Sequence, residues 1–274
     1  MNIAVVNTKG GVGKSTISSM ILPLFFAEEV EDNGRTVNVY EIDNNNKSVF
    51  SGSSAINFKN IKVKDAEDVI TKIQMDFDKK SDSINIIDSG GGDDTVAILK
   101  YMQEMEVEGL IYIIPANDDI EQTENIKQTI SLIKNIDPNA KIILALNRVI
   151  TDSSIINEDE LKGQFIGLYG NQEMGIEPVI EQLRDELIGI VGIPNTPIFG
   201  ILKNLKHITA IDYYNKNIEV VENFSEHRKR WIEQGDEAYK RNYQEFQIAK
   251  KLVNVRKSLK EFEELIKKVD ENAE

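Results

Sequence analysis

The chain has 274 residues, of which 41% are hydrophobic and 28% charged, enough for one large α/β domain with or without an appendage. It contains no cysteine, which excludes thiolate-bound iron–sulfur clusters, cysteine zinc sites and cysteine nucleophiles. The formal net charge of −14 argues against a protein that coats nucleic acid, so any DNA contact must come from a local basic patch.

Two features of the sequence bear on where the protein acts. No apolar run approaches the ~20 residues that a helix needs to cross a bilayer. The first residues form an apolar strand that leads into a glycine run, without the basic segment and cleavage site of a signal peptide. We therefore expect a cytoplasmic protein without a stable membrane association.

Short apolar strands alternate with amphipathic helices through the first half of the chain, which is the pattern of a parallel sheet covered by helices on both faces. The expected strands are Ile3–Val6, Val37–Ile42, Ile84–Ile87, Leu110–Ile114 and Ile142–Leu146, with a shorter one near Thr196–Phe199. The expected helices are about Lys14–Glu28, Ala66–Phe77, Thr95–Glu106, Ile120–Ile136 and Glu158–Gly167, with an inserted helix at Gly175–Gly192 and a turn at Asn195–Pro197. The predicted fold class is therefore α/β.

After roughly Tyr214 the pattern becomes helical and strongly charged, so we divide the chain into an α/β domain, residues 1–220, and a helical extension, residues 221–274. The extension holds 12 Lys/Arg and 12 Asp/Glu, so the whole net charge of −14 lies in residues 1–220. Apolar residues recur in the extension at alternating steps of four and three: Ile248, Leu252, Val255, Leu259, Phe262, Ile266 and Val269. This stripe indicates either a terminal helix packed on its own domain or a helix that pairs between subunits.

The most informative segment is the run from Lys9 to Ser15, Lys-Gly-Gly-Val-Gly-Lys-Ser, which follows a strand and precedes a helix. Amide N–H groups in such a glycine-rich turn point inward and bind phosphates, aided by the helix N-terminus. We expect Lys14 to reach the β- and γ-phosphates and the Ser15 hydroxyl to bind Mg²⁺. The ordered Gly-Lys-Ser-Thr run disfavours a plain connecting turn. The predicted ATP-binding residues are Lys9, Gly10, Gly11, Val12, Gly13, Lys14, Ser15 and Thr16.

One position departs from the strict P-loop pattern, which has glycine five positions before Gly13, where this chain has Thr8. The next residue, Lys9, is the mark of the deviant Walker A motif, and in it the chain resembles the ParA/MinD family of P-loop ATPases. The resemblance implies a P-loop NTPase fold, an ATP-dependent homodimer and a Lys9 that crosses the dimer interface to the other subunit's ATP. There the lysine would place positive charge where the transition state spreads negative charge.

Supporting residues follow the expected strands in the family's order. By the resemblance, Asp43 after the second strand orients the attacking water, and Asp88 after the third holds Mg²⁺ through water. The implied catalytic residues are Lys9, Lys14 and Asp43. Asn147 follows the strand that ends at Leu146, where family members place an asparagine that reads adenine, although asparagine is also a common turn former.

Two stretches differ from the family. Its second strand usually ends in Asp-x-Asp-Pro-Gln, whereas residues 41–45 are Glu-Ile-Asp-Asn-Asn. After the Walker B strand many partition members have Asp-x-Pro-Pro, whereas residues 88–92 are Asp-Ser-Gly-Gly-Gly. Three glycines predict either a mobile switch that responds to the γ-phosphate or a loose connecting loop. We still expect the ATP chemistry, but the differences weaken the assignment to DNA partition.

The absence of cysteine separates several relatives. Nitrogenase-type reductases and iron–sulfur carrier ATPases need cluster-binding thiolates and are excluded, and arsenite and tail-anchor ATPases are disfavoured. Tyr239 and Tyr243 are too few, and too far from the end, for the tyrosine cluster of a bacterial tyrosine kinase. A MinD-like membrane-associated positioning ATPase needs a basic amphipathic C-terminal helix, whereas residues 269–274 are Val-Asp-Glu-Asn-Ala-Glu. That class remains a second alternative.

The favoured class is ParA-like: an ATP-dependent dimer that binds DNA without sequence preference and acts in plasmid or chromosome partition with a ParB-like adaptor. The candidate DNA-binding residues are Lys203 and Lys206. Residues 228–257 add nine Lys/Arg against four Asp/Glu, although charged helices are usually solvated faces. Such a protein would associate with the nucleoid. The first alternative is a conjugation- or localisation-associated, ATP-switched interaction module, similar to TraL, that does not bind DNA.

Overall fold

The computed structural model describes residues 1–44, 52–79, 81–120, 122–153 and 155–271. Three features of the sequence analysis lie partly outside this range: the unusual end of the second strand (Asn45), an expected helix (Glu121) and the acidic C-terminal stretch 269–274 (its last three residues, Asn272–Glu274). Statements below about what is absent refer to the described residues.

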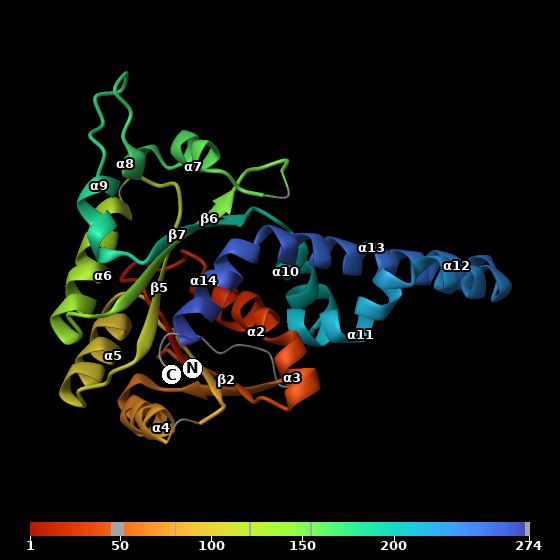
Figure 1. Ribbon diagram of the computed structural model, residues 1–274, viewed down its shortest axis with the longest axis horizontal. Helices are drawn as coiled ribbons and strands as arrows, with labels where there is room; N and C mark the ends of the chain where they lie inside the picture. Colours follow the sequence, from red (N-terminus) through yellow and green to blue (C-terminus); the bar gives the residue numbers. More distant parts are fainter. Residues whose placement is uncertain (45–51, 80, 121, 154, 272–274) are drawn as a thin grey trace.

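The centre of the molecule is a seven-stranded parallel sheet with the order β3-β2-β4-β1-β5-β6-β7. Its strands are β1 (Asn2–Val5), β2 (Val37–Ile42), β3 (Ile56–Ile61), β4 (Ile84–Ser89), β5 (Leu110–Ala116), β6 (Lys141–Val149) and β7 (Gly189–Pro194). Helices lie on both faces of the sheet (Figure 1). The predicted α/β class is therefore confirmed.

The two edge strands differ from the predictions. β3 has no counterpart among the expected strands, because most of its side chains are polar or partly exposed and only Ile56 is buried. β7 lies earlier in the chain than the strand expected near Thr196–Phe199, where helix α10 begins instead. Its glycines allow neighbours to pack closely, since a Cβ on Gly189 would lie 2.4 Å from the Leu265 side chain. The inserted helix expected at Gly175–Gly192 is therefore wrong over its last part, because a short apolar segment with glycines fits either a helix or a closely packed strand.

The helices agree with the predicted order, with several breaks. Those before β5 are α1 (Lys14–Thr16), α2 (Leu22–Phe25), α3 (Ala27–Asn33), α4 (Ala66–Asp78) and α5 (Asp93–Glu104). Those between β5 and β7 are α6 (Gln122–Ile136), α7 (Glu158–Gln164), α8 (Ile166–Tyr169) and α9 (Ile180–Leu183). Those after β7 are α10 (Ile198–Gly200), α11 (Ala210–Glu222), α12 (Phe224–Glu233), α13 (Asp236–Ser258) and α14 (Lys260–Glu271). The inserted helix expected at Gly175–Gly192 is thus reduced to α9 and a following 3-10 turn, Arg184–Glu186.

The helix after the glycine run contains a π-helical stretch, η1 (Ile17–Ile21), between α1 and α2. Pro23 is the second residue after it, in the first turn of α2. Because proline has no backbone N–H, the regular bond from position 23 to the carbonyl of Ser19 cannot form. A π stretch accommodates that gap without ending the helix.

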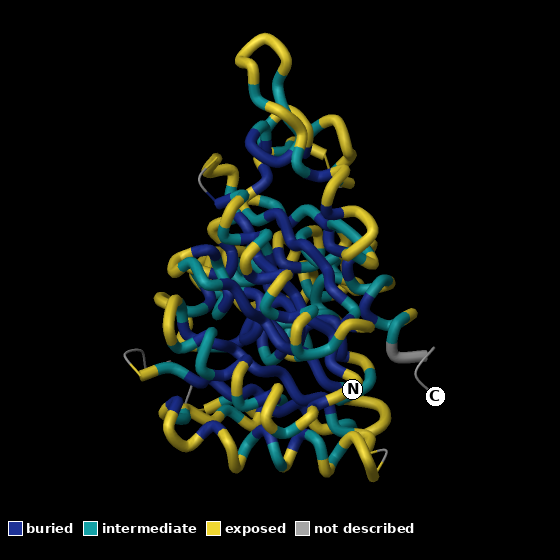
Figure 2. The backbone as a smooth tube through the Cα atoms, turned by 90° about the vertical axis from the view of Figure 1, so that its left-hand side faces the viewer, coloured by how far each residue is buried: buried dark blue, intermediate teal, exposed yellow. Residues whose placement is uncertain are grey.

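Side chains alternate along the strands and build one apolar core on each face of the sheet. Buried backbone runs through the middle of the molecule, and the exposed segments lie around it (Figure 2). In β1, Ile3 and Val5 belong to the first core and Ala4 belongs to the second. The first core is completed by η1, α2, α11, α13 and α14, and the second by α4, α5 and α6. The glycine run therefore lies at the end of a strand that is buried on both sides.

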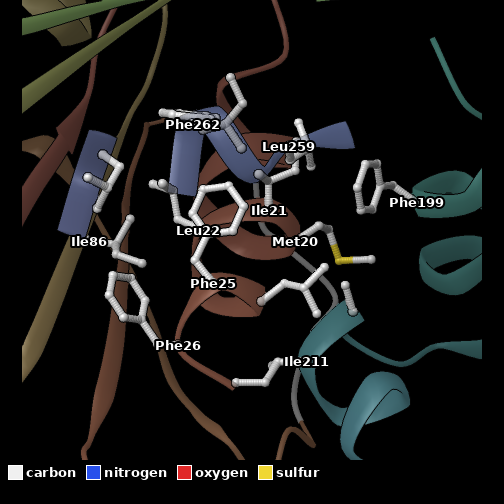
Figure 3. Close-up of a cluster of buried hydrophobic side chains, with 14 of the residues drawn as sticks. Met20, Ile21, Leu22, Phe25, Phe26, Ile86, Phe199, Ile211, Leu259 and Phe262 are labelled. Carbon is white, nitrogen blue, oxygen red and sulfur yellow. The ribbon is translucent and has the colours of Figure 1, made fainter. Parts of the chain in front are cut away.

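The C-terminal apolar stripe packs on its own domain. Leu252, Leu259, Phe262 and Ile266 are at most 1% exposed and belong to the first core, and the other three stripe residues pack against it. The Phe262 ring meets Phe25 of α2 edge-on at 5.3 Å (Figure 3). The intramolecular interpretation of the stripe is therefore correct, since its apolar surface is not free to pair with another subunit. The division of the chain after residue 220 stays a prediction, but α14 shares the core of the preceding residues.

A helical arm, defined here as residues 224–246, projects away from the sheet (Figure 1). It consists of α12 and the first half of α13. An aromatic cluster joins the two helices: Phe224 stacks on Phe246 at 4.0 Å between ring centroids, and Trp231 packs against both. None of the described helices has both the length and the apolar composition needed to cross a membrane.

Candidate nucleotide site

The glycine run forms a loop between β1 and α1. Gly11 and Gly13 have φ values of 74° and 101°, in the left-handed region that favours glycine. A Cβ on Gly13 would also lie 2.2 Å from Nδ2 of Asn147, so no side chain fits there. The path of this loop therefore depends on glycine at both positions.

Lys14, the first residue of α1, is only 7% exposed. Its Nζ donates to the carbonyl oxygens of Asn7 at 3.1 Å and Lys9 at 2.9 Å, on the strand side of the same loop. Burial lowers the pKa of Lys14, while the nearby carboxylates of Asp88 and Asp43 raise it. The structure thus brings the predicted phosphate-binding cation close to both predicted aspartates.

Asp88 lies near the end of β4 and is 2% exposed. The net pKa of Asp88 is raised to about 7: burial raises it most, the hydroxyls of Ser15 and Ser18 lower it, Glu41 raises it and Lys14 lowers it. Its Oδ1 has no hydrogen-bond partner among the described residues. A buried carboxylate oxygen without a partner, beside a serine hydroxyl, suits an oxygen-binding cation such as Mg²⁺. No cluster of three or more His, Asp or Glu that could hold a metal by itself occurs in the described chain, so phosphate and water would complete this site.

Asp43 follows β2 directly and is partly buried. Its backbone N–H donates to the Ile61 carbonyl of β3 at 3.1 Å, which fixes where the chain leaves the sheet. Its carboxyl group faces Gly90, the first glycine after β4, because a Cβ on Gly90 would lie 3.2 Å from Asp43 Cγ. The predicted water-orienting residue is therefore a neighbour of the glycines that follow β4.

The glycine loop, residues 90–92, is held between the P-loop and the end of β2. Gly90 N–H donates to the Ile42 carbonyl at 2.8 Å, and Gly92 N–H donates to the Thr8 carbonyl at 2.8 Å. A Cβ on Gly91 would lie 3.1 Å from Gly10 Cα, so the two glycines lie in close contact. The loop is therefore bound at both ends in this state rather than loosely connected.

Asn147, near the end of β6, contacts the P-loop from the other side. Its Nδ2 donates to the Val12 carbonyl at 2.9 Å, and its Oδ1 accepts from the Arg148 N–H at 2.9 Å. Both polar atoms of its amide group thus bind backbone in this state. Reading of adenine by Asn147 stays a prediction.

Sequence reasoning missed three residues that hold the site together. Asn7 accepts from the Lys9 N–H at 2.8 Å and donates to the Pro115 carbonyl at 2.7 Å, which anchors the start of the loop. Asp94 and Thr95, in the first turn of α5, bind the neighbouring loops. Asn7 lies two residues after β1, where the strand leads into the glycine run, and that position was the signal that could have identified it. Asp94 and Thr95 lie in the first turn of a helix, where such residues are common, so their positions carried no comparable signal.

Lys9 is partly exposed, and its backbone binds Asn7 and Lys14 as described above. Its action across a dimer interface stays a prediction. Lys203 and Lys206 lie in a π-helical turn, η4 (Ile201–Lys206), after α10. Lys206 forms an ion pair with Glu245 of α13, whose carboxylate also accepts from the Tyr213 hydroxyl at 2.8 Å. The structure thus places Lys206 at the base of the arm.

A scan against protein-family models gives no match, and neither does a search of curated proteins. Similar solved structures include a candidate plasmid partition protein from Borrelia burgdorferi B31 bound to AMPPNP, with 13% identity, a TM-score of 0.39, and coverage of 69% of this chain and 85% of that one. They also include a LAO/AO transport system kinase, with 12% identity, a TM-score of 0.37, and coverage of 99% of this chain and 68% of that one. Likeness at this level says nothing about activity. The parallel sheet, the glycine run after β1 and the aspartates near the ends of β2 and β4 are the elements of a P-loop NTPase, and the chain has that fold.

Proposed function

We propose that this chain is a Mg²⁺-dependent ATPase of the ParA-like type, which dimerises with ATP bound. One observation carries the proposal: Lys14, Asp88, Asp43 and the glycine loop converge at one edge of the sheet. In the proposed reaction these supply a cation, a metal-binding carboxylate, a water-orienting carboxylate and a glycine segment beside the phosphates, the parts that phosphoryl transfer to water needs.

Each residue has a distinct role in the proposed reaction. Lys14 binds the β- and γ-phosphates and stabilises the charge that develops on them. Ser15 and Asp88 would hold Mg²⁺, which neutralises phosphate charge when bound. Asp43 orients the water that attacks the γ-phosphate. Lys9 of the opposite subunit adds positive charge to the transferred group, so hydrolysis requires the dimer.

Replacement of Asp43 tests the hydrolytic role. Asp43→Ala should leave ATP affinity within about 2-fold of the wild-type value and lower phosphate release by ~100-fold or more, since only the attacking water loses its partner. Asp68→Ala removes an exposed carboxylate from α4 and serves as the matched control. Hydrolysis by Asp43→Ala at the wild-type rate would remove Asp43 from the mechanism.

Replacement of Lys9 tests the dimer. Sedimentation with AMPPNP should show a dimer for the wild type and mainly monomer for Lys9→Ala, with nucleotide binding by the monomer largely retained. Unchanged dimerisation together with unchanged hydrolysis would make Lys9 an ordinary loop lysine.

The finer proposal is that the ATP-bound dimer binds DNA without sequence preference and acts in partition with a ParB-like adaptor. A dimer offers Lys203 and Lys206 twice, so binding gains from bivalency and falls steeply with salt. Binding to random-sequence DNA should require ATP and should be lost when both lysines are replaced by Glu. Replacement of Lys64 and Lys100 by Glu, which makes the same charge change at exposed positions elsewhere, is the control.

One observation favours the alternative function, an ATP-switched interaction module that does not bind DNA. Glu245 neutralises Lys206, which reduces the positive charge available to phosphates. If the wild-type ATP-bound dimer fails to bind random DNA even at low salt, the partition proposal falls and the interaction module is the better account.

A further inference from the structure

We infer that Asp94, in the first turn of α5, is a positioning residue that sets the place of Asp43 and couples it to the glycine loop. The inference rests on the proposed ATPase function, because it assigns Asp94 a role in that reaction. Among the described hydrogen bonds, none joins Asp94 to Lys14, or to Ser15 and Asp88, the residues proposed to hold Mg²⁺. Asp94 acts instead through Asn44.

Asn44, the residue after Asp43, uses every polar group it has. Its backbone N–H donates to Asp94 Oδ2 at 3.0 Å, and its Nδ2 donates to Asp94 Oδ1 at 2.8 Å. Its side-chain oxygen accepts from the Val63 N–H at 3.3 Å, and its carbonyl accepts from Lys62 Nζ. The chain leaving β2 is therefore attached on one side to the segment after β3 and on the other to α5.

The chemistry of these contacts requires a carboxylate at position 94. Asn44 presents two donors, and a carboxylate is the side chain of this length with an acceptor oxygen for each. Such charge-assisted bonds are stronger than bonds between neutral groups. An amide at the same position would offer one acceptor and turn its own donors toward an N–H of Asn44. Asp94 thus matches Asn44 in a way that its neighbour Asp93, which is exposed, does not.

Asp94 also borders the glycine loop. A Cβ on Gly90 would lie 2.7 Å from both Cβ and Oδ2 of Asp94 and 3.2 Å from Cγ of Asp43. Gly90 therefore lies between the two aspartates, and any shift of this loop changes the space between them. The Asp94 N–H also donates to the Gly91 carbonyl at 3.3 Å.

The next residue of α5 extends the same connection to the P-loop. Thr95 is fully buried, and its hydroxyl contacts the Gly90 carbonyl at 2.5 Å, the Asn7 carbonyl at 3.1 Å and the Ser89 hydroxyl at 3.1 Å. The Asn7 carbonyl is also an acceptor for Lys14. One turn of α5 therefore binds the P-loop, the glycine loop and the segment that carries Asp43.

This arrangement gives a route by which the γ-phosphate can affect the attacking water. Gly91 lies against Gly10, and a Cβ added at Gly91 would lie 3.8 Å from Lys14 Nζ. A phosphate that displaces the glycine loop shifts the first turn of α5, and Asp94 transmits the shift to Asn44 and so to Asp43. The part that changes between two conformations in this mechanism is the glycine loop, since glycine has the fewest steric limits on its backbone angles.

The test compares Asp94→Ala with Asp93→Ala, which removes the same charge from the same helical turn. Asp94→Ala should lower the kcat for ATP hydrolysis by ~10–100-fold and leave ATP affinity within about 2-fold, because the nucleotide contacts remain while the attacking water is misplaced. Asp93→Ala should change neither value by more than about 2-fold. Asp94→Asn preserves shape and one acceptor, so its kcat should lie between those of the wild type and Asp94→Ala.

A double-mutant cycle with Asn44→Ala separates positioning from a general loss of stability. If Asp94 acts through Asn44, the double variant should be no slower than the slower single variant, whereas independent effects would multiply. Hydrogen exchange adds a readout that does not depend on hydrolysis: the Asn44 amide should exchange faster in Asp94→Ala but not in Asp93→Ala.

The outcomes distinguish this inference from the proposed function. Wild-type protein that hydrolyses no nucleotide would overturn both. Active wild type with Asp94→Ala as fast as Asp93→Ala would overturn the positioning role alone, as would multiplicative effects in the cycle or unchanged exchange of the Asn44 amide.

Discussion

The nucleotide edge of the sheet and the helical arm are held together in opposite ways. At the nucleotide edge, hydrogen bonds join residues that are far apart in the chain: Asn7 to Pro115 spans 108 positions, and Asn147 to Val12 spans 135. In the arm, the aromatic contacts join residues of two consecutive helices, such as Phe224 and Phe246. The site therefore exists only when the whole sheet is folded, whereas the arm depends mainly on its own two helices.

The residues that follow the arm are held in a third way, by packing on the central sheet. The second half of α13 and the apolar residues of α14 up to Val269 return to the sheet and contribute to the first core, which also contains residues of β1. The arm is thus an excursion between two segments of the central fold. Changes in α14 should act on the whole molecule, and changes in the arm should act locally.

The largest expected effect follows from Phe262, in α14. Phe262→Ala should lower the free energy of unfolding by about 3–5 kcal/mol, since the ring is fully buried against Phe25 and its removal leaves a cavity. Leu205→Ala, at a position that is 74% exposed, should change it by less than about 0.5 kcal/mol. Denaturant unfolding measures both. Equal stability of the two variants would mean that α14 is not part of the core.

The next effect concerns the nucleotide edge alone. Lys14→Ala should weaken ATP binding by ~100-fold or more, about 2.7 kcal/mol, because the buried ammonium group that binds the β- and γ-phosphates is lost. The fold should remain intact, since Lys14 binds two loop carbonyls rather than the core. Calorimetric titration with ATP, beside a thermal unfolding curve, measures the two effects separately. Binding within 5-fold of the wild-type value would contradict the P-loop assignment.

The sequence predicted the parts of the fold in which local pattern and burial agree. Five of the predicted strands are buried on both faces and read as apolar runs, and all five are present. β3 and β7 lie at the edges of the sheet, where polar residues or closely packed glycines replace that signal. Their positions depend on neighbours from distant parts of the chain, which no local pattern contains.

The same limit applies to the candidate site. Lys14, Asp43 and Asp88 could be found from their places after strands, and the structure brings them together. Asp94 could not be found in this way, because an aspartate in a first helical turn is common in any helix. Its contacts with Asn44, fifty positions earlier in the chain, appear only in the folded structure.

A smaller loss of ATP affinity is expected from replacement of Asn147, the residue of β6 that contacts the P-loop. Asn147→Ala removes one hydrogen bond to the Val12 carbonyl and should weaken ATP binding by ~5–10-fold. GTP binding should weaken equally, because the lost contact holds the loop rather than the base. Competition titrations with the two nucleotides measure the ratio. A loss confined to ATP would instead support the reading of adenine by Asn147.

The smallest effect on the nucleotide site is expected from the arm. Trp231→Ala removes the largest ring from the aromatic cluster, so backbone amides of α12 should exchange with solvent faster. ATP affinity and the rate of hydrolysis by the isolated protein should stay within about 2-fold of the wild-type values, because the cluster makes none of the contacts described for the P-loop, Asp43 or Asp88. Ile232→Ala, at the next position and 59% exposed, controls for a change in the same helix.

The result of this comparison decides whether the two regions are independent. A slower hydrolysis in Trp231→Ala, with Ile232→Ala unchanged, would show that the arm is coupled to the nucleotide edge. The structure offers one chain of contacts for such coupling: Glu245 in the arm binds Lys206 and Tyr213, and Tyr213 of α11 belongs to the first core together with Ile17 at the start of η1. If hydrolysis is unchanged while the arm loses protection, that path transmits no effect in the isolated protein. The arm would then contribute to function only through what it binds.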